Sequence, residues 1–547
     1  MQVHEPANKA QNRRHRYRSR KTGVGKKRDA NAAPEPASRA DKMEMEQPAD
    51  QVAAGISDNM QMDAPSTGTH MSNVRFADLP LSAASQDAIS NMGFRNLTNV
   101  QAATLPHIMK GKDVLAKAKT GTGKTVAFLL PSIEKIRASM PSKSSTISIL
   151  ILSPTRELAA QIANEAKSLI RFHGFRVELV VGGTNMTSEA QRLRASGGVE
   201  LLVATPGRLL DHLKNTNGFS LQLCGIQILV LDEADQLLER GFQPDIVRIL
   251  GFLPAKEYRQ TLLFSATVPA SLHDIVHLAL RDDHQFIDTV GDADEQTNSQ
   301  VEQFSAIVSL DQQFSVLEAL IRDHISICSE YKIIVFFPTA RGVGYFALLF
   351  SSLGLSILEM HSRKSQAQRT KISNQFRENS NVIMFTSDVS ARGVDYPDVS
   401  LIIQVGLTTK EQYIHRVGRT GRAGREGKSI LLLAPFERKL LSQMQDLPIQ
   451  DISQNPLISS KLQSKQLLKA LSSVDKTAVL QKAAQQAYQA FLGFYNSNLR
   501  MVNWSKSDLV RVANDYAKIM GLSDVPALQK KTVGMMGLRG VQGLRVE

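Results

Sequence analysis

Short apolar runs alternate with amphipathic helical segments between residues 76 and 435, and this alternation restricts the possible folds more than any other feature of the chain. The pattern is typical of a parallel α/β sheet. A definite polar motif, rather than a generic turn, directly follows most of the expected strands. Since ligands of open α/β sheets bind beyond the carboxyl ends of the strands, these motifs are candidates for a functional site. The expected strands are residues 147–152, 201–204, 228–231, 261–264, 333–337, 382–385 and 430–433.

The 547 residues are enough for two or three domains, each with its own core. The first 70 residues are rich in Ala, Pro, Gln, Ser and charge and poor in large apolar side chains, which predicts disorder. The strand pattern ends near residue 435, and a helical pattern replaces it. The expected order is a disordered arm at 1–70, an α/β domain at 71–290, a polar linker at 291–300, a second α/β domain at 301–435, a helical extension at 436–521 and a Gly-rich, mildly basic tail at 522–547.

The net charge of +13 favours a polyanionic partner such as nucleic acid, although a basic tail on an otherwise neutral enzyme would give the same total. Ten of the positive residues lie at or before Arg28, where Glu5 is the only acid. The two cysteines, Cys224 and Cys328, are far apart and lack CxxC spacing, which argues against a zinc site or a disulfide framework. We expect no membrane span, because no apolar run is long enough to cross a bilayer.

The segment AKTGTGKT, at residues 118–125, fits a phosphate-binding loop between a strand and a helix. Gly121 and Gly123 would let backbone N–H groups turn inward to cradle phosphates. Lys124 would place its charge at the β- and γ-phosphates, and the Thr125 hydroxyl could ligate Mg²⁺. The predicted nucleotide contacts here are Ala118, Lys119, Thr120, Gly121, Thr122, Gly123, Lys124 and Thr125.

The segment DEAD, at residues 232–235, follows the predicted strand at 228–231. A carboxylate at the end of a buried strand beside a phosphate-binding loop is the Walker B arrangement, so we expect Asp232 to hold Mg²⁺ together with Thr125. Glu233 is the candidate for orienting and activating the attacking water. Lys124, Asp232 and Glu233 are therefore the predicted catalytic residues of the first domain.

Three further segments of the first domain, PTRELA, Gly182-Gly183 and TPGR, place small or basic groups after strands. Arg156, Thr205 and Arg208 are suited to phosphate contacts, and Gly183 and Gly207 permit a close approach to the backbone. Helix caps and turns would use the same residue types. Contacts of this kind would give little base specificity, because they reach phosphate and sugar.

Eight motifs in one fixed order, covering roughly residues 76–435, make the chain resemble the DEAD-box RNA helicases. They are GFRNLTNVQ (93–101), AKTGTGKT (118–125), PTRELA (154–159), TPGR (205–208), DEAD (232–235), SAT (265–267), TSDVSARGVD (386–395) and HRVGRTGR (415–422). Within the family, HSRKSQAQRT, DVSARGVDYPDVSLIIQVGL and the helical extension are most similar to the branch of mitochondrial intron-splicing helicases and their plant relatives. The resemblance implies two tandem RecA-like domains, a monomeric core, and ATP, Mg²⁺ and RNA as ligands.

The resemblance also assigns roles that the residues alone do not. Gln101 and Phe76 would read the adenine, and Asp395 would bind the ribose. Asp235, Ser265 and Thr267, with His415 and Arg416 from the second domain, would couple hydrolysis to domain movement. Arg419 and Arg422 would act as arginine fingers, and Asp388 belongs to the second RNA-contact set. The remaining RNA contacts implied for the second domain are Thr339, Gln366, Arg369, Thr386 and Gly393.

Two functions fit this motif set. The first is an ATP-dependent RNA helicase that remodels short duplexes by closing its two domains, and the alternative is an ATP-gated RNA clamp within a ribonucleoprotein complex. The presence of every catalytic residue favours turnover. The extension would either help to bend RNA, as in the related branch, or only stabilise the second domain. The arm fits a mitochondrial transit peptide, a nuclear or nucleolar signal, or an RNA-binding segment, so the compartment stays open within the cell.

Overall fold

The computed structural model describes residues 71–139, 146–194, 198–239, 241–290, 301–388, 396–421, 426–460 and 464–547. The predicted arm and linker lie outside these residues. The described residues form two sheets of seven strands, and every strand in them runs parallel to its neighbours. This confirms the predicted fold class of two parallel-sheet domains. None of the described helices is long and apolar enough to cross a bilayer.

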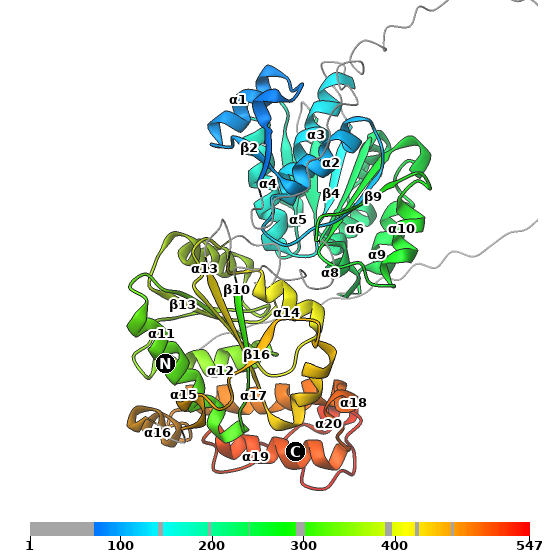
Figure 1. The fold of residues 1–547 in the computed structure, drawn as a ribbon. Coiled ribbons are helices and arrows are strands. Elements are labelled where there is room, and N and C mark those ends of the chain that lie inside the picture. The colour runs from blue at the N-terminus through cyan, green and yellow to red at the C-terminus, as the bar shows by residue number, and fades with distance from the viewer. Residues whose placement is uncertain are drawn as a thin grey trace, which may run out of the picture. The chain divides into compact units, whose positions relative to one another are not determined.

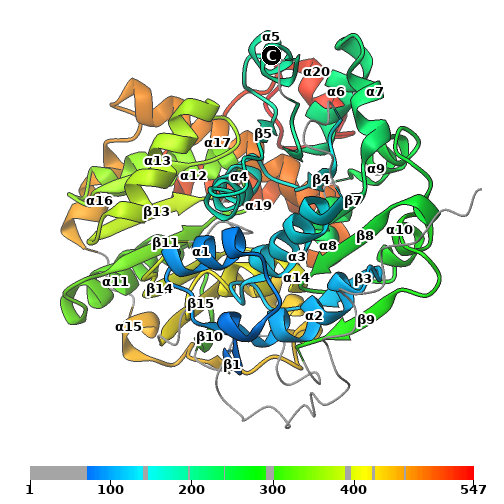
Figure 2. The ribbon, with the colours of Figure 1, turned by 90° about the horizontal axis from the view of Figure 1, so that it is seen from above.

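In the first domain the strand order is β5-β6-β4-β7-β8-β3-β9. Successive side chains of a strand point to opposite faces of a sheet. Ile149 and Ile151 therefore pack with α3 and α4, whereas Leu150 and Leu152 pack with α6, α9 and α10. Figure 2 shows α3 and α10 on opposite sides of β7 and β8. Because both faces are buried, the strands read as continuous apolar runs.

The strands of this sheet are β3 Val114–Lys117, β4 Ile149–Leu152, β5 Val177–Val180, β6 Leu201–Ala204, β7 Ile228–Asp232, β8 Gln260–Ser265 and β9 Gln285–Asp288. A separate antiparallel pair is formed by β1 Met71–Arg75 and β2 Asn96–Thr98. The α-helices are α1 Ala83–Asn91, α2 Asn99–Met109, α3 Lys124–Ser139, α4 Arg156–Leu169, α5 Met186–Arg194, α6 Pro206–Asn215, α7 Phe219–Gln222, α8 Ala234–Glu239, α9 Gln243–Leu250 and α10 Leu272–Ala279. Short 3₁₀ helices are η1 Phe76–Asp78, η2 Leu223–Gly225 and η3 Lys256–Tyr258.

The second domain has the strand order β12-β13-β11-β14-β15-β10-β16. Its strands are β10 Val301–Ile307, β11 Lys332–Phe336, β12 Ile357–Met360, β13 Val382–Thr386, β14 Leu401–Val405, β15 Gly427–Leu433 and β16 Ile449–Asp451. Its helices are α11 Leu310–Ile327, α12 Ala340–Ser351, α13 Gln366–Glu378 and α14 Lys410–Val417. The strand pattern was expected to end near residue 435, and β16 corrects this. This three-residue edge strand pairs only with β10 and contains one apolar residue, too little for a sequence signal.

The helical extension shares its core with the second domain. It comprises η5 Pro435–Gln443, α15 Pro456–Ser459, α16 Lys465–Ser472, α17 Ala478–Ser497, α18 Leu499–Val502, α19 Lys506–Ile519 and α20 Lys530–Met535. Helix α17 packs between α12 and α19, as Figure 1 shows. Tyr488 and Leu492 of the extension belong to the same buried cluster as Val335 of β11, and the Tyr345 hydroxyl donates to the Met520 carbonyl at 2.7 Å. The change of sequence pattern near residue 435 therefore does not separate two hydrophobic cores.

This shared core predicts different effects for two leucines of the extension. Leu492 is fully buried and Leu468 is half exposed. Leu492→Ala should lower the free energy of unfolding by about 2–5 kcal/mol, because it leaves a cavity. Leu468→Ala should change that free energy by less than about 0.5 kcal/mol. The sole tryptophan, Trp504, lies 4.4 Å from Phe436 in ring-centroid distance, so its fluorescence during urea unfolding reports on this region. Equal midpoints for the two variants would contradict the shared core.

Candidate functional site

The phosphate-binding loop connects β3 to the first turn of α3. Gly121 and Gly123 have φ values of +80° and +86°, a left-handed backbone that glycine adopts without strain. A Cβ on Gly123 would lie 2.6 Å from Gln101 Nε2, so the loop leaves no room for a side chain there. The Ala118 N–H donates to the Ser265 carbonyl at 2.9 Å, which ties the loop to the end of β8. The loop therefore has the shape of a phosphate cradle.

Two acids and a lysine meet beside this loop. Asp232 ends β7, and Glu233 follows it with a φ of +50°. That conformation is uncommon for a residue with a side chain and is often found at functional sites. The Lys124 ammonium group lies 3.1 Å from Glu233 Oε1, and all three side chains are buried. The structure therefore brings together the three residues that were predicted to be catalytic in this domain.

The two neighbouring carboxyl groups differ in pKa. Burial, and then the charge of Glu233, raise the pKa of Asp232 to about 7. Burial acts in the same direction on Glu233, but the charges of Lys124 and His415 outweigh it and lower the pKa of Glu233. Asp232 Oδ1 is buried and has no hydrogen-bond partner among the described residues. A buried carboxylate oxygen without a partner fits a divalent cation, which prefers oxygen ligands.

Asp235 joins the acid cluster to the end of β8. One of its carboxylate oxygens, Oδ2, accepts from the Thr267 hydroxyl at 2.8 Å and from the Thr267 N–H at 3.2 Å. The Ser265 hydroxyl accepts from the Asp235 N–H at 3.2 Å and donates to the Thr267 carbonyl. The structure thus brings Asp235, Ser265 and Thr267 into one network, as the resemblance implied.

A histidine from the second domain completes this network. His415 lies on α14, and its Nε2 is 3.0 Å from Asp235 Oδ2. Its Nδ1 is 3.6 Å from Glu233 Oε2, and neither of these two atoms has a hydrogen-bond partner within the described part of the chain. His415 is completely buried between the two acids. The acidic end of β7 is therefore covered by a side chain of the other domain.

Two arginines near His415 have different surroundings. Arg419 is buried, its Nε donates to the His415 carbonyl at 3.2 Å, and its charge helps to lower the pKa of Glu233. Arg416 instead donates to Asp388 at 2.6 Å and 3.0 Å and lies over the Phe336 ring at 5.2 Å. These partners of Arg416 belong to the second domain, whereas the resemblance had placed Arg416 between the domains.

Gln101 and Phe76, the predicted adenine readers, lie in different surroundings. Gln101 Nε2 donates to the Gly123 carbonyl at 3.0 Å, and its Oε1 accepts from the Thr98 N–H at 2.9 Å. An amide has a second N–H and a second lone pair, so it retains the capacity to pair with a base edge. The Phe76 ring is only 2% exposed and lies 6.4 Å from the Phe94 ring. Phe76 thus has little ring surface open for stacking on a base.

The predicted RNA contacts of the first domain line a single region. A Cβ on Gly182 would meet the Arg156 guanidinium group at 2.9 Å, and Gly183 has a φ of +86°. Thr205 precedes α6 without capping it through its side chain. A Cβ on Gly207 would meet no atom of the described residues within 4 Å. Arg208, in contrast, is paired with Glu189 at 2.6 Å.

The predicted RNA contacts of the second domain are partly engaged with the first domain. Arg369 lies 2.5 Å from Glu157, and Gln366 donates to Glu157 at 3.1 Å. Thr339 caps α12 through the Gly342 N–H at 3.0 Å, and Thr386 is completely buried. Gln366 and Arg369 therefore hold the two domains together here, and their predicted RNA contacts remain predictions. The predicted residues Gly393, Asp395 and Arg422 lie outside the described residues.

Sequence reasoning did not single out three residues that the structure places in these contacts. Glu157 lies inside PTRELA, beside the basic residue that was chosen. Glu189 belongs to none of the eight motifs. Gly418 lies between two predicted arginines, where a Cβ would overlap the Thr120 hydroxyl of the phosphate-binding loop. The sequence offered a clue to Glu157 and Gly418, because both lie inside motifs, and none to Glu189.

Comparison with known proteins gives matches over most of the chain. The DEAD/DEAH box helicase family matches residues 98–275, and the helicase conserved C-terminal domain matches residues 312–424. DEAD-box ATP-dependent RNA helicase 26 of Oryza sativa subsp. japonica is 48% identical over 480 residues, which is 87% of each protein. The protein of the same name from Arabidopsis thaliana is 47% identical over 501 residues, covering 89% of this chain. The chain spans 58% of the length of that Arabidopsis relative.

The fold matches solved structures over a similar length. The structure of Mss116p bound to ssRNA and AMP-PNP has a TM-score of 0.75 and 27% sequence identity, and the match covers 85% of this chain and 95% of that one. A second structure, of Mss116 bound to ssRNA and UDP-BeF, has a TM-score of 0.76 and 26% identity. It covers 87% of this chain and 98% of that chain. Residues 1–435 make up only about 80% of the 547 residues, so these matches reach into the extension.

The contact between Gly418 of the second domain and Thr120 of the first predicts a variant that impairs only the arrangement in which the two domains touch. Gly418 has a φ of −64°, so Gly418→Ala causes no backbone strain, but its Cβ would overlap the Thr120 hydroxyl. We expect Gly418→Ala to bind ATP as the wild type does and to lose about tenfold or more of RNA-stimulated hydrolysis. Thr120→Ala removes the overlapping oxygen and should restore activity to the double variant. Equal activity of Gly418→Ala and wild type, or a double variant as impaired as Gly418→Ala, would contradict this contact.

Proposed function

Because the chain belongs to the DEAD-box RNA helicase family, we propose that it is an RNA-dependent ATPase that remodels short RNA duplexes by closing its two domains. One observation carries the proposal: His415 of the second domain lies within 3.0 Å of Asp235 and 3.6 Å of Glu233 in the first. The full set of charged groups needed for hydrolysis therefore comes together only when the two domains are in contact. The resemblance of the fold to Mss116p, bound in its own structure to ssRNA and AMP-PNP, supports the same reading.

The first domain would hold the nucleotide. The amides of the loop around Gly121 and Gly123 would bind the phosphates, and Lys124 would exchange Glu233 for a phosphate oxygen. Mg²⁺, held by Asp232 and Thr125, would neutralise charge on the β- and γ-phosphates. Gln101 would read the adenine edge while staying bonded to the loop through Gly123. This link would let the identity of the base affect the shape of the phosphate cradle.

Glu233 would activate the attacking water. Its lowered pKa keeps it ionised at neutral pH and therefore able to accept a proton. As the water oxygen bonds to the γ-phosphorus, the bond to the β–γ bridging oxygen breaks, giving ADP and phosphate. Arg419 would stabilise the charge that spreads over the γ-phosphate oxygens, a role that can be worth roughly 10³- to 10⁵-fold in rate.

RNA would bind where the two domains face it together. Arg156, Gly183, Thr205 and Gly207 supply basic or small groups from the first domain, and Thr339 lies at the start of α12 in the second. Such contacts reach phosphate and sugar, so we expect little base preference and a preference for RNA where the 2′-hydroxyl is touched. An ATP-gated RNA clamp would use the same residues without releasing a strand.

Glu233→Gln tests the hydrolytic mechanism. It removes the charge that holds Lys124, so we expect ATP binding at least as tight as in the wild type and hydrolysis slower by roughly 10²- to 10⁴-fold. Lys124→Ala should lose ATP binding instead. The measurements are ATP affinity and phosphate release with saturating single-stranded RNA. Wild-type turnover by Glu233→Gln would show that another group activates the water.

The helicase and clamp readings differ in strand release. For the wild type we expect release of a short RNA duplex with ATP that exceeds release with a non-hydrolysable analogue, and little release of the matching DNA duplex. Hydrolysis with stable RNA binding and no strand release would favour the clamp. The absence of RNA-stimulated hydrolysis would refute both readings.

A further inference from the structure

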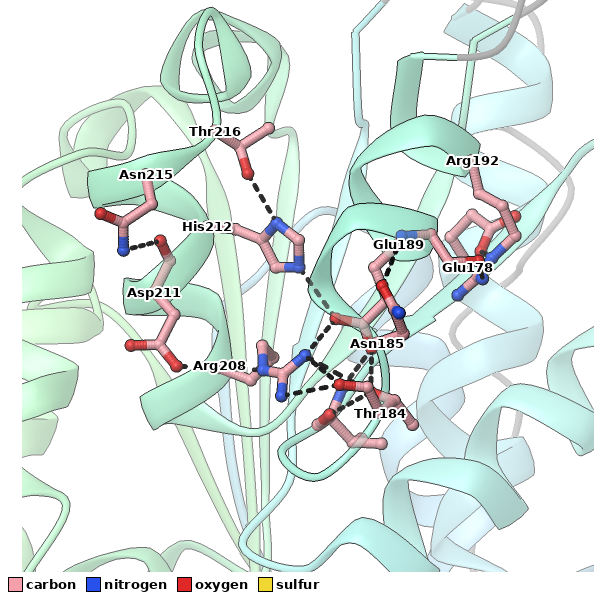
Figure 3. A network of polar contacts seen from close by, with 12 residues as sticks. Glu178, Thr184, Asn185, Glu189, Arg192, Arg208, Asp211, His212, Asn215 and Thr216 are labelled. Carbon is pink, nitrogen blue, oxygen red and sulfur yellow. Dashed lines mark hydrogen bonds and ion pairs between the residues drawn. The ribbon is translucent and has the colours of Figure 1, made fainter. Parts of the chain in front are cut away.

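A buried polar network connects three segments of the first domain beside the predicted RNA contacts. Glu189 lies on α5, Arg208 and His212 lie on α6, and Thr184 ends the Gly182-Gly183-Thr184 turn after β5. Figure 3 shows these side chains pointing toward one another. The three side chains named on the two helices, Glu189, Arg208 and His212, are all at least nine-tenths buried. The nucleotide site does not use this network.

Both terminal nitrogens of the Arg208 guanidinium group donate hydrogen bonds to other protein groups. Its Nη1 donates to Glu189 Oε2 at 2.6 Å. Both Nη atoms donate to the Thr184 carbonyl at 3.2 Å. Its Nε is buried, and the side chain as a whole is 10% exposed. To reach a phosphate directly, Arg208 would have to leave Glu189 as a buried charge without its cation, which is strongly unfavourable.

Glu189 also contacts Thr184, Val181 and His212. Its Oε1 accepts from the Thr184 hydroxyl and from the Val181 N–H at 3.3 Å. Its Oε2 lies 3.0 Å from His212 Nε2, whose Nδ1 is 2.9 Å from the Thr216 hydroxyl. Burial raises the pKa of Glu189, but hydrogen bonds from His212, Thr184 and Arg208 outweigh it and bring it to about 2. Glu189 therefore stays ionised and joins β5, the turn and α6.

The Gly182-Gly183-Thr184 turn and the start of α6, which this network joins, can both offer neutral backbone N–H groups to a ligand. Gly183 has a φ of +86° and Gly207 has open space beside its Cα, so backbone N–H groups can approach a ligand closely. Thr205 lies at the start of α6 with no side-chain capping bond. Backbone N–H groups of a turn and of a helix N-terminus are common phosphate ligands.

We propose that Arg208 is a positioning residue rather than a phosphate ligand. Held by Glu189, which His212 also contacts, Arg208 locks the Gly182-Gly183-Thr184 turn to the start of α6, so that both segments contact the RNA backbone as one surface. This inference rests on the proposed RNA binding and deepens it. It also assigns to Glu189 and His212 a part in RNA affinity, although neither touches the RNA.

The salt dependence of RNA binding separates this role from a direct contact. A cation that neutralises a phosphate of a single strand contributes roughly 0.7 to the slope of log affinity against log salt. Neutral N–H contacts release no counterion. If Arg208 acts by positioning the two segments, its removal should therefore weaken RNA binding at every salt concentration and leave the slope unchanged. Loss of Arg208 as a phosphate ligand should lower the slope by roughly 0.7.

The experiment uses the full chain with a non-hydrolysable ATP analogue and a labelled single-stranded RNA, and measures Kd between low and moderate salt. The variants are Arg208→Ala, Arg208→Lys, Glu189→Gln and the double variant Arg208→Ala with Glu189→Gln. Arg192→Ala is the matched control, because Arg192 also lies on α5 but pairs with Glu178 at 2.9 Å in a solvent-exposed position. We expect Arg192→Ala to bind within about twofold of the wild type.

For a positioning role, Arg208→Ala and Glu189→Gln should each weaken binding by roughly tenfold, and the double variant should be no weaker than the worse single variant. Arg208→Lys should be nearly as weak as Arg208→Ala, because an ammonium group cannot replace the planar fork that holds Glu189 and Thr184 together. The proposal is overturned if the slope falls by roughly 0.7, if Arg208→Lys restores binding, or if Glu189→Gln strengthens it by freeing Arg208.

Two further measurements distinguish a folding defect from a defect in RNA binding. Thermal unfolding and ATP-analogue binding check that each variant is folded, and Arg208→Lys, which keeps the charge, decides the question if a neutral variant does not fold. A wild-type protein that bound no RNA would refute the proposed function itself. Normal wild-type binding with a lowered slope in Arg208→Ala would refute only the positioning role.

Discussion

Three acids buried at the end of one strand are the constraint on which the site depends. Asp232, Glu233 and Asp235 are all at most 3% exposed, and closely spaced carboxylates cannot all be ionised at low cost without cations nearby. Lys124 supplies one cation from the same domain at 3.1 Å from Glu233. The other neighbours, His415 and Arg419, come from the second domain. Among the described residues, the first domain therefore supplies this cluster with one close cation, and contact with the second domain adds the side chains of His415 and Arg419.

The same constraint accounts for the local backbone around the acids. Parallel strands place their carboxyl ends along one edge of the sheet, so β7, β8 and the loop after β3 meet there. Glu233 adopts a φ of +50°, which turns its side chain toward Lys124 and His415 while Asp232 remains in the strand. Network bonds from Thr267 and Ser265 fix Asp235 on the other side. Strain at one residue is thus maintained by contacts from three segments, as is usual at functional sites.

The sequence predicted the elements and the residues at their ends, but not every partner of those residues. The strands could be predicted because both faces are buried, as Ile149 and Leu150 illustrate, and the acids could be predicted because they follow such a strand. Arg369 and Arg208 were predicted to bind RNA, and the structure pairs them with Glu157 and Glu189. A motif gives the type of a residue and its place at a strand end. It does not say which of several neighbouring acids lies opposite.

The extension shows the same limit on a larger scale, and it bears on domain closure. Its helical pattern differs from the strand pattern before it and does not show what it packs against, yet Leu492 and Tyr516 share one core with β11 and β14. An aromatic series runs from Phe337, two residues before Thr339, through Phe346 and Phe314 to Tyr516 in α19. Segments with a common core open and move as one cooperative unit. In the proposed domain closure, the extension therefore moves with the second domain when His415 approaches or leaves Asp235.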